Sequence, residues 1–195
     1  DFINISLEDD NDFDDLKVTG KLPFNQLPLL ELDDLKLSQS CAMISYLARR
    51  GDLYGETSEN ALMCDMLVGA VVDFNIPAMQ FAFKADKHEA CRDLDDSLKK
   101  FGKHFEFILN QNEGEFLVGE KISVADVIMA ESLTSFIEFS PTCLKNYPLL
   151  SQLQEKVVSE HNINKYLNSN NRWRLPDKQY VIDIARVLCR PLPSH

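Results

Sequence analysis

Residues 27–51 read LPLLELDDLKLSQSCAMISYLARRG, and this stretch decides the fold of the N-terminal part of the chain. Two short apolar runs, 27–32 and 35–37, are separated only by Asp33-Asp34. Apolar runs joined by a two-residue acidic turn predict a β-hairpin. The hairpin is expected to have an edge or bend near its start, because the Pro28 nitrogen cannot donate to a strand ladder.

A helix is expected directly after the hairpin. Ser38-Gln39-Ser40 is followed by apolar residues that lie mainly on one helical face over 41–50. Arg49 and Arg50 complement the C-terminal end of a helix dipole, and Gly51 ends the helix.

The rest of the chain divides into a short segment before the hairpin and a long helical part after it. Residues 2–7 alternate apolar and polar side chains, which predicts a strand, and an acidic irregular stretch follows over 9–15. Helical periodicity predicts helices over 57–83, 87–111, 123–139 and 149–158, with a short one near 162–168.

Two local signals refine these helices. Pro77 is expected to kink or end the helix that contains it, because proline lacks an amide donor. Ser123 precedes Asp126 by three residues, which predicts a capping box at the start of the helix over 123–139.

Composition and charge exclude several function classes. The net charge of −11 argues against binding nucleic acid, since a polyanion requires a basic surface. No apolar run approaches the roughly 20 residues of a membrane helix, so no membrane span is expected. The five cysteines include no CxxC pair and indicate reduced thiols in the cytoplasm. The four histidines lack ligand spacing, so no metal is expected.

The order of these features resembles one family. The stretches LPFNQLPLLELDDLKLSQSCAMISYLAR and FLVGEKISVADV are similar to cytosolic glutathione transferases, most closely to the sigma class. The resemblance implies an α+β glutathione-transferase fold. A truncated thioredoxin-like, glutathione-binding domain would occupy residues 1–51, and an all-α domain would occupy 57–170. A tail with a helix would follow over 171–195.

The resemblance also implies a glutathione site. Leu27, before a cis Pro28, would pair through its backbone with the cysteinyl unit of glutathione, and Gln26 would support it. Gln39 and Ser40 would hold the γ-glutamyl carboxylate, because free amides and the dipole at a helix start favour an anion. The alternative is that Ser38-Gln39-Ser40 only caps the helix.

Further residues carry weaker expectations by resemblance. Asp73 would reach the glutathione amine of a partner subunit, or would be a solvated acid. Phe13 stands where the sigma class carries a Trp donor to the glycyl end. Gly69 and Val72 replace acidic residues of a divalent-metal cluster, so no such metal site is expected. Three residues are candidates for apolar substrate walls, although such residues more often belong to the core: Phe74, Met79 and Phe81.

The family fold begins with a strand and a helix that would precede residue 2, and the first strand carries the Tyr that stabilises the glutathione thiolate. The chain is therefore expected to lack that Tyr, which leaves its activity open. The tail over 172–195 carries an amphipathic stripe. It is expected to fold over the electrophile pocket, or to pack into the gap left by the missing segment or onto a partner.

Three functions follow from this pattern. The first is a cytoplasmic, homodimeric glutathione transferase that conjugates glutathione sulfur to small hydrophobic electrophiles. The second is a non-catalytic member of the fold that serves as a binding or assembly module. The third is a cysteine-based thiol transferase, which would need a Cys in the missing strand. Cys41 is expected to be packed inside its helix instead.

Overall fold

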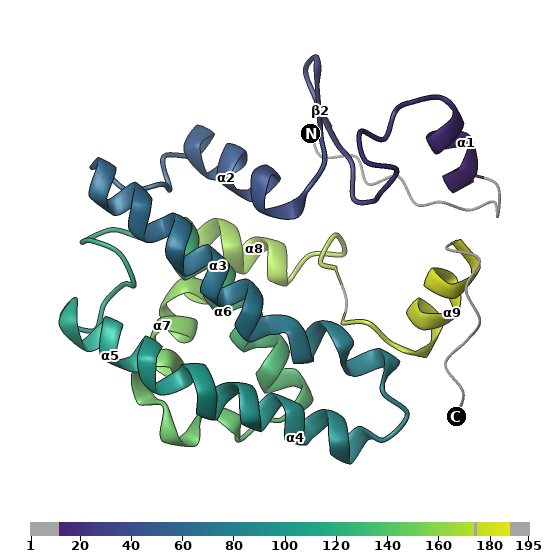
Figure 1. Cartoon of the computed structure of the whole chain (residues 1–195). Helices are drawn as coiled ribbons and strands as arrows, with labels where there is room; N and C mark the ends of the chain where they lie inside the picture. The colour runs from purple at the N-terminus through teal and green to yellow at the C-terminus, as the bar shows by residue number, and fades with distance from the viewer. Residues whose placement is uncertain (1–11, 174, 188–195) are drawn as a thin grey trace.

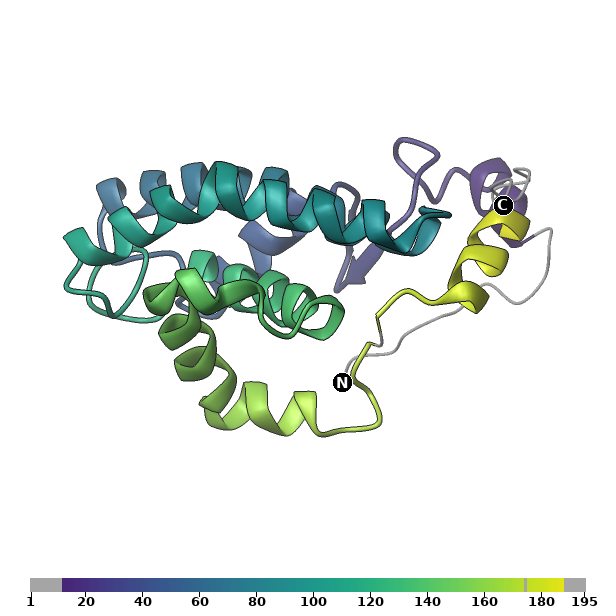
Figure 2. The ribbon, with the colours of Figure 1, turned by 90° about the horizontal axis from the view of Figure 1, so that it is seen from below.

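The fold is a bundle of helices with one two-stranded hairpin at its edge (Figure 1). The computed structural model describes residues 12–173 and 175–187. The strand expected over 2–7 lies outside this range. In both views of the ribbon, helices α1 and α9 lie at the end of the molecule away from α5 (Figures 1 and 2).

The predicted hairpin is present, with shorter strands than the apolar runs suggested. Strand β1 (Leu30–Leu32) pairs antiparallel with β2 (Leu35–Leu37), and these are the strands of the sheet within the described residues. Asp33 in the turn has a φ of 53°, a left-handed conformation that Asp tolerates better than most residues. Helix α2 (Ser40–Arg50) follows at once and ends at Gly51, as predicted.

The acidic segment before the hairpin forms a helix where an irregular stretch was expected. Helix α1 spans Asp12–Val18, and Lys17 stabilises it through an ion pair with Asp14 at 2.6 Å. Phe13 is buried, and the Lys17 ammonium lies 3.9 Å from the centre of its ring. An i,i+3 ion pair and a buried aromatic side chain together favour the helix over a solvated turn.

The C-terminal part is helical, as predicted. Its elements are α3 (Ser58–Gln80), η1 (Phe81–Phe83), α4 (Lys87–Ser97), η2 (Leu98–Gly102), α5 (Lys103–Gln111), α6 (Val124–Phe139), η3 (Cys143–Asn146), α7 (Pro148–Ser159), α8 (His161–Leu167) and α9 (Lys178–Val187).

Helix α3 continues past Pro77 and ends three residues later, at Gln80. One turn before Pro77, the hydroxyl of Ser97 donates to the carbonyl of Phe74 at 2.7 Å, so a buried side chain supplies a hydrogen bond beside the proline. With η1, this helix is long and apolar enough by composition to span a membrane, although no such run was expected. Its buried side packs on α4 and α6, which is the arrangement of a core helix.

The helix predicted over 87–111 is present with a local change of winding. A π-helical turn, η2, separates α4 from α5. Gly102 ends this turn beneath the ring of Tyr147, where a Cβ atom would lie 2.5 Å from the ring edge. Glycine therefore allows the close contact between η2 and the start of α7.

The core gathers around aromatic side chains between α3, α5 and α6. Phe74 is fully buried and stacks on Phe136 with ring centroids 4.5 Å apart. Phe105 and Phe101 meet Phe74 edge-on at 5.8 and 6.3 Å. These offset and edge-to-face contacts fix how the three helices pack.

The predicted capping box is present at the start of α6. The buried carboxyl group of Asp126 accepts hydrogen bonds from the amide of Ser123 at 2.8 Å and from the hydroxyl of Ser123 at 2.7 Å. It also accepts from the amide of Leu117 at 2.7 Å, which ties the preceding loop to the helix. Burial raises the pKa of Asp126, while these hydrogen bonds act in the opposite direction.

The tail forms the helix that its amphipathic stripe predicted. Val181 of α9 is buried, and Tyr180 meets Phe83 edge-on with centroids 6.0 Å apart. The tail therefore docks on η1, at the C-terminal end of α3.

Candidate functional site

The predicted glutathione residues lie where the hairpin meets α2. Gln39 has a φ of 73° and a ψ of 110°, in a region that side chains other than glycine rarely adopt. Such backbone positions occur often at ligand sites. No side chain caps the first turn of α2, which begins at Ser40, so its amides remain available to an anion.

The fold brings together two predicted residues that are far apart in sequence. The side-chain amide of Gln39 donates to the side-chain oxygen Oε1 of Gln26 at 3.5 Å, across 13 positions of the chain. The Leu27–Pro28 peptide is cis, as the resemblance implied, and the side chain of Leu27 is 41% exposed. Gln26, Leu27, Gln39 and Ser40 thus form an accessible polar edge beside the hairpin.

One buried polar atom beside this edge lacks a partner. The hydroxyl oxygen of Ser38 is buried and makes no hydrogen bond in the structure. Buried hydroxyl groups are normally satisfied, so an unsatisfied one next to a candidate ligand site is notable.

Asp73 lies apart from this edge, in the middle of α3. Its side chain is exposed and makes no hydrogen bond or ion pair with any residue that the structure describes. It is thus free to meet a second molecule, and its predicted role toward a partner subunit stays a prediction.

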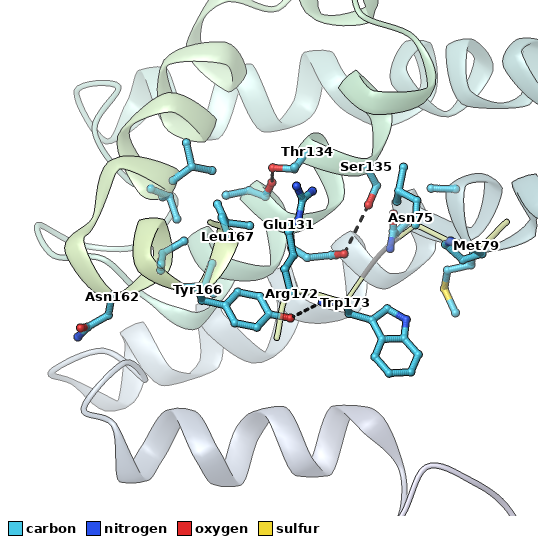
Figure 3. Close-up of a pocket in the computed structure, with 18 residues that line it drawn as sticks. Asn75, Met79, Glu131, Thr134, Ser135, Asn162, Tyr166, Leu167, Arg172 and Trp173 are labelled. Atoms are coloured by element: carbon cyan, nitrogen blue, oxygen red, sulfur yellow. Dashed lines mark hydrogen bonds between the residues drawn. The ribbon is translucent and has the colours of Figure 1, made fainter. Parts of the chain in front are cut away.

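A cavity of about 500 Å³ opens between α3, α6, α7, α8 and the start of the tail (Figure 3). Its walls are mainly apolar, which is typical of sites for small organic ligands. The apolar and aromatic lining residues are Ala78, Met79, Val127, Ala130, Val157, Val158, Ile163, Tyr166, Leu167, Trp173, Leu175 and Pro176. The remaining lining residues are Asn75, Glu131, Thr134, Ser135, Asn162 and Arg172.

The tail closes one side of this cavity through specific contacts. The amide of Trp173 donates to the phenol oxygen of Tyr166 at 3.0 Å, and the guanidinium of Arg172 pairs with Glu138 on α6. The first residues of the tail therefore cover this cavity, and the expected position of the tail over an electrophile pocket stays a prediction.

Of the three residues predicted to form apolar substrate walls, one lines the cavity and two do not. Met79 lines the cavity, with 60% of its side chain exposed. Phe74 belongs to the aromatic core, and Phe81 stacks on Phe139 with centroids 3.8 Å apart. Neither Phe lines the cavity, because Phe74 packs between α3 and α6 and the ring of Phe81 in η1 packs against that of Phe139.

The cysteines differ from the expectation at one position. Cys41 is exposed on the first turn of α2, although it was expected to be packed. Burial instead raises the pKa of Cys143 to about 11. The four cysteines of the described ranges are all free thiols, and no cluster of three potential metal ligands occurs in the same ranges.

Comparisons with known proteins agree with this architecture. The family profile described as "Glutathione S-transferase, C-terminal domain" matches residues 72–170. A chicken (Gallus gallus) protein named glutathione S-transferase is 33% identical over 187 residues, covering 93% of this chain and 83% of that protein. Rat (Rattus norvegicus) glutathione S-transferase alpha-1 is 30% identical, covering 92% and 82%.

The chain belongs to the glutathione S-transferase family. The fold agrees with that of a solved relative, the monomeric glutathione S-transferase Na-GST-3 of the hookworm Necator americanus. That structure has a TM-score of 0.72 and 25% identity, covering 80% of this chain and 81% of its own.

Sequence reasoning missed Glu131. This residue is the one acid in the middle of the apolar sequence VIMAESLTSF of α6. An acid within this mainly apolar stretch could have drawn attention to it, because such a side chain normally needs a polar partner or an open cavity.

Proposed function

We propose that this member of the glutathione S-transferase family binds glutathione at the hairpin edge and conjugates its sulfur to small hydrophobic electrophiles. The observation that carries the proposal is the uncapped start of α2, with Gln39 in a left-handed conformation and Ser40 as the first helical residue. Free amides at a helix start favour a carboxylate, and glutathione carries one at its γ-glutamyl end.

Each predicted residue has a defined part in this proposal. The Ser40 hydroxyl and the first amides of α2 hold the γ-glutamyl carboxylate, while the side chain of Gln39 closes over it. The hydrogen bond from Gln39 supports Gln26 in the position next to the Leu27 backbone, which pairs with the cysteinyl unit. Asp73 contacts the glutathione amine of a second subunit.

The apolar cavity supplies the place for the electrophile. Met79 and the tail residues Leu175 and Pro176 line it. A tail that folds over the bound electrophile would need to contribute such residues. Its volume of about 500 Å³ suits a small organic molecule.

The rate of glutathione conjugation to chlorodinitrobenzene tests the proposal. The wild-type chain is expected to exceed the uncatalysed rate. Ser40→Ala is expected to raise KM for glutathione about tenfold, because it loses a hydrogen bond to a charged group. Ser58→Ala is a matched control, since Ser58 is also an exposed first residue of a helix.

Two results would count against the proposal. An equal effect of Ser40→Ala and Ser58→Ala would remove the assigned role of the α2 start. Glutathione binding without conjugation would favour a non-catalytic binding module of the same fold.

The class within the family is a finer part of the proposal. The two sequence motifs support a sigma-like enzyme, whereas the rat relative carries an alpha-class name. The tail is the alpha-like feature of this chain, because its residues before α9 line the cavity and α9 follows as a C-terminal helix. Removing residues 172–195 tests this feature, because an alpha-like tail should change substrate preference when it is lost.

A homodimer is proposed on the exposed face of α3. Apolar side chains recur there every three or four residues, and open space surrounds Gly69 between them. The exposed apolar residues of this face are Leu62, Met63, Met66, Val72 and Ile76. Such a stripe suits packing against a second helix.

Light scattering on the purified chain tests the assembly. We expect a mass of two chains for the wild type and of one chain for Met66→Glu, which places a charge in the middle of the stripe. A wild-type chain that is a monomer, as the hookworm relative is described to be, would contradict this part of the proposal.

A cytoplasmic location and the absence of nucleic-acid, membrane and metal partners complete the proposal. The free thiols of the described cysteines support the location, and the net charge of −11 argues against a nucleic-acid partner.

A further inference from the structure

Glu131 is an acid that faces an apolar cavity. It lies on α6 and lines the cavity, where the hydroxyl of Ser135 is its hydrogen-bond donor at 3.5 Å. Figure 3 shows its carboxyl group among cavity side chains, with Asn75 to one side. Among the residues that the structure describes, no lysine, arginine or histidine forms an ion pair with Glu131.

The nearest candidate cation in the cavity wall is already engaged. Arg172 lines the cavity, but its guanidinium pairs with Glu138, which lies two turns further along α6. Glu138 is a like charge, and it disfavours ionisation of Glu131. Within the described residues, the acid pair on α6 therefore has one arginine, and no ion pair compensates the charge of Glu131.

Glu131 is accessible to a ligand from the cavity, and the cavity around it has few polar side chains. The side chain is accessible because it faces the cavity, yet protein walls surround it and raise its pKa. An opposite charge brought into such a site interacts more strongly than it does in water. A cation next to Glu131 is therefore the group that the described cavity wall does not supply.

We propose that the cavity binds apolar molecules that carry a protonated amine, with the ammonium group at Glu131 and the apolar body against α3, α7, α8 and the tail. The ammonium donates to the carboxylate oxygens of Glu131. Asn75 also lines the cavity, and its buried side-chain oxygen, which has no hydrogen-bond partner among the described residues, is a second acceptor. This inference rests on the proposed function in one respect, because the proposed function identifies this cavity as the electrophile site. The binding of the amine itself does not depend on conjugation.

Trp173 provides the measurement. It is the only tryptophan of the chain and lines the cavity, so its fluorescence reports a bound ligand directly, without glutathione or turnover. The probes are phenylbutylamine, phenylbutanol and phenylbutyrate, which share one apolar body and differ in the head group. About 0.15 M salt screens the distant charges of this acidic chain.

The amine is expected to bind about tenfold more tightly than the alcohol, which corresponds to about 1.4 kcal/mol. The carboxylate is expected to bind most weakly. In Glu131→Gln, a nearly isosteric change, the amine should fall to the affinity of the alcohol, while the alcohol changes little. Glu155→Gln, an exposed acid of α7 outside the cavity, is the matched control and should keep the preference.

An amine that binds no more tightly than the alcohol in the wild type would overturn the inference, and that comparison needs no variant. A preference that survives Glu131→Gln would overturn it as well. Amine binding that fails while chlorodinitrobenzene is conjugated would refute only this inference. Amine binding without conjugation would instead leave it standing and refute the proposed activity.

Discussion

Phe74 and Phe24 are both phenylalanines, but they lie in two regions of the molecule that differ in how far their side chains are buried. Phe74 is fully buried between three helices of the C-terminal part, whereas Phe24, ahead of the hairpin, is 63% exposed. The same contrast holds for whole elements, since α6 buries most of its length and the hairpin buries none of its residues fully. The helical body thus supplies stability, and the hairpin edge supplies accessible backbone and polar groups for a ligand.

The largest expected effect breaks the aromatic core. Phe74→Ala should lower the free energy of unfolding by about 3–5 kcal/mol, because it removes a ring that contacts three other rings and leaves a cavity. Urea unfolding followed by circular dichroism measures it. Phe24→Ala is the matched control, with a change within about 0.5 kcal/mol. Similar losses in both variants would refute the contrast.

Thiol reactivity sharpens the same comparison. Cys143 in the helical body has a pKa of about 11, so only about one molecule in a thousand is a thiolate at pH 8. The exposed Cys41 should react first with Ellman's reagent. Cys41→Ala should remove the fast phase and Cys143→Ala should leave it unchanged; the reverse pattern would contradict the burial of Cys143.

The capping box of α6 should have a smaller but measurable effect. Asp126→Ala leaves the buried amides of Ser123 and Leu117 without their acceptor and should lower the free energy of unfolding by about 2–3 kcal/mol. Asp34→Ala in the exposed hairpin turn is the control and should change the unfolding midpoint little. If Asp126→Ala lowers the free energy of unfolding no more than Asp34→Ala does, the capping box does not hold the loop to α6.

The smallest effect is a difference in local opening. Amides of β1 and β2 should exchange with solvent faster than those of α6, because a two-stranded sheet with half-buried side chains opens without unfolding the body. Hydrogen exchange followed by mass spectrometry measures it. Equal protection in both elements would mean that the hairpin opens only with the whole protein.

Much of the fold could be predicted from the sequence because its signals are local. The hairpin turn at Asp33-Asp34, the stop at Gly51 and the capping box of Ser123 with Asp126 depend on residues close in sequence, and the structure confirms all three. Helix α1 was missed because its stability depends on burying Phe13, which local composition does not reveal.

The candidate site was predictable only where its residues follow a motif. Gln26 and Gln39 were expected at one site, and the structure brings them together. The cavity around Glu131 was not predictable, because α3, α6, α8 and the tail meet there through tertiary packing. For the same reason, sequence periodicity could not separate Met79, in the cavity wall, from Phe74, in the core.

The most direct test of the account is a calorimetric titration of the chain with glutathione and with cysteinylglycine, which lacks the γ-glutamyl group. We predict that glutathione binds at least about tenfold more tightly, a difference of about 1.4 kcal/mol. This difference should disappear in Ser40→Ala and persist in Ser58→Ala. Equal affinities of the wild type for the two peptides would contradict the assignment of the α2 start as the glutathione carboxylate site.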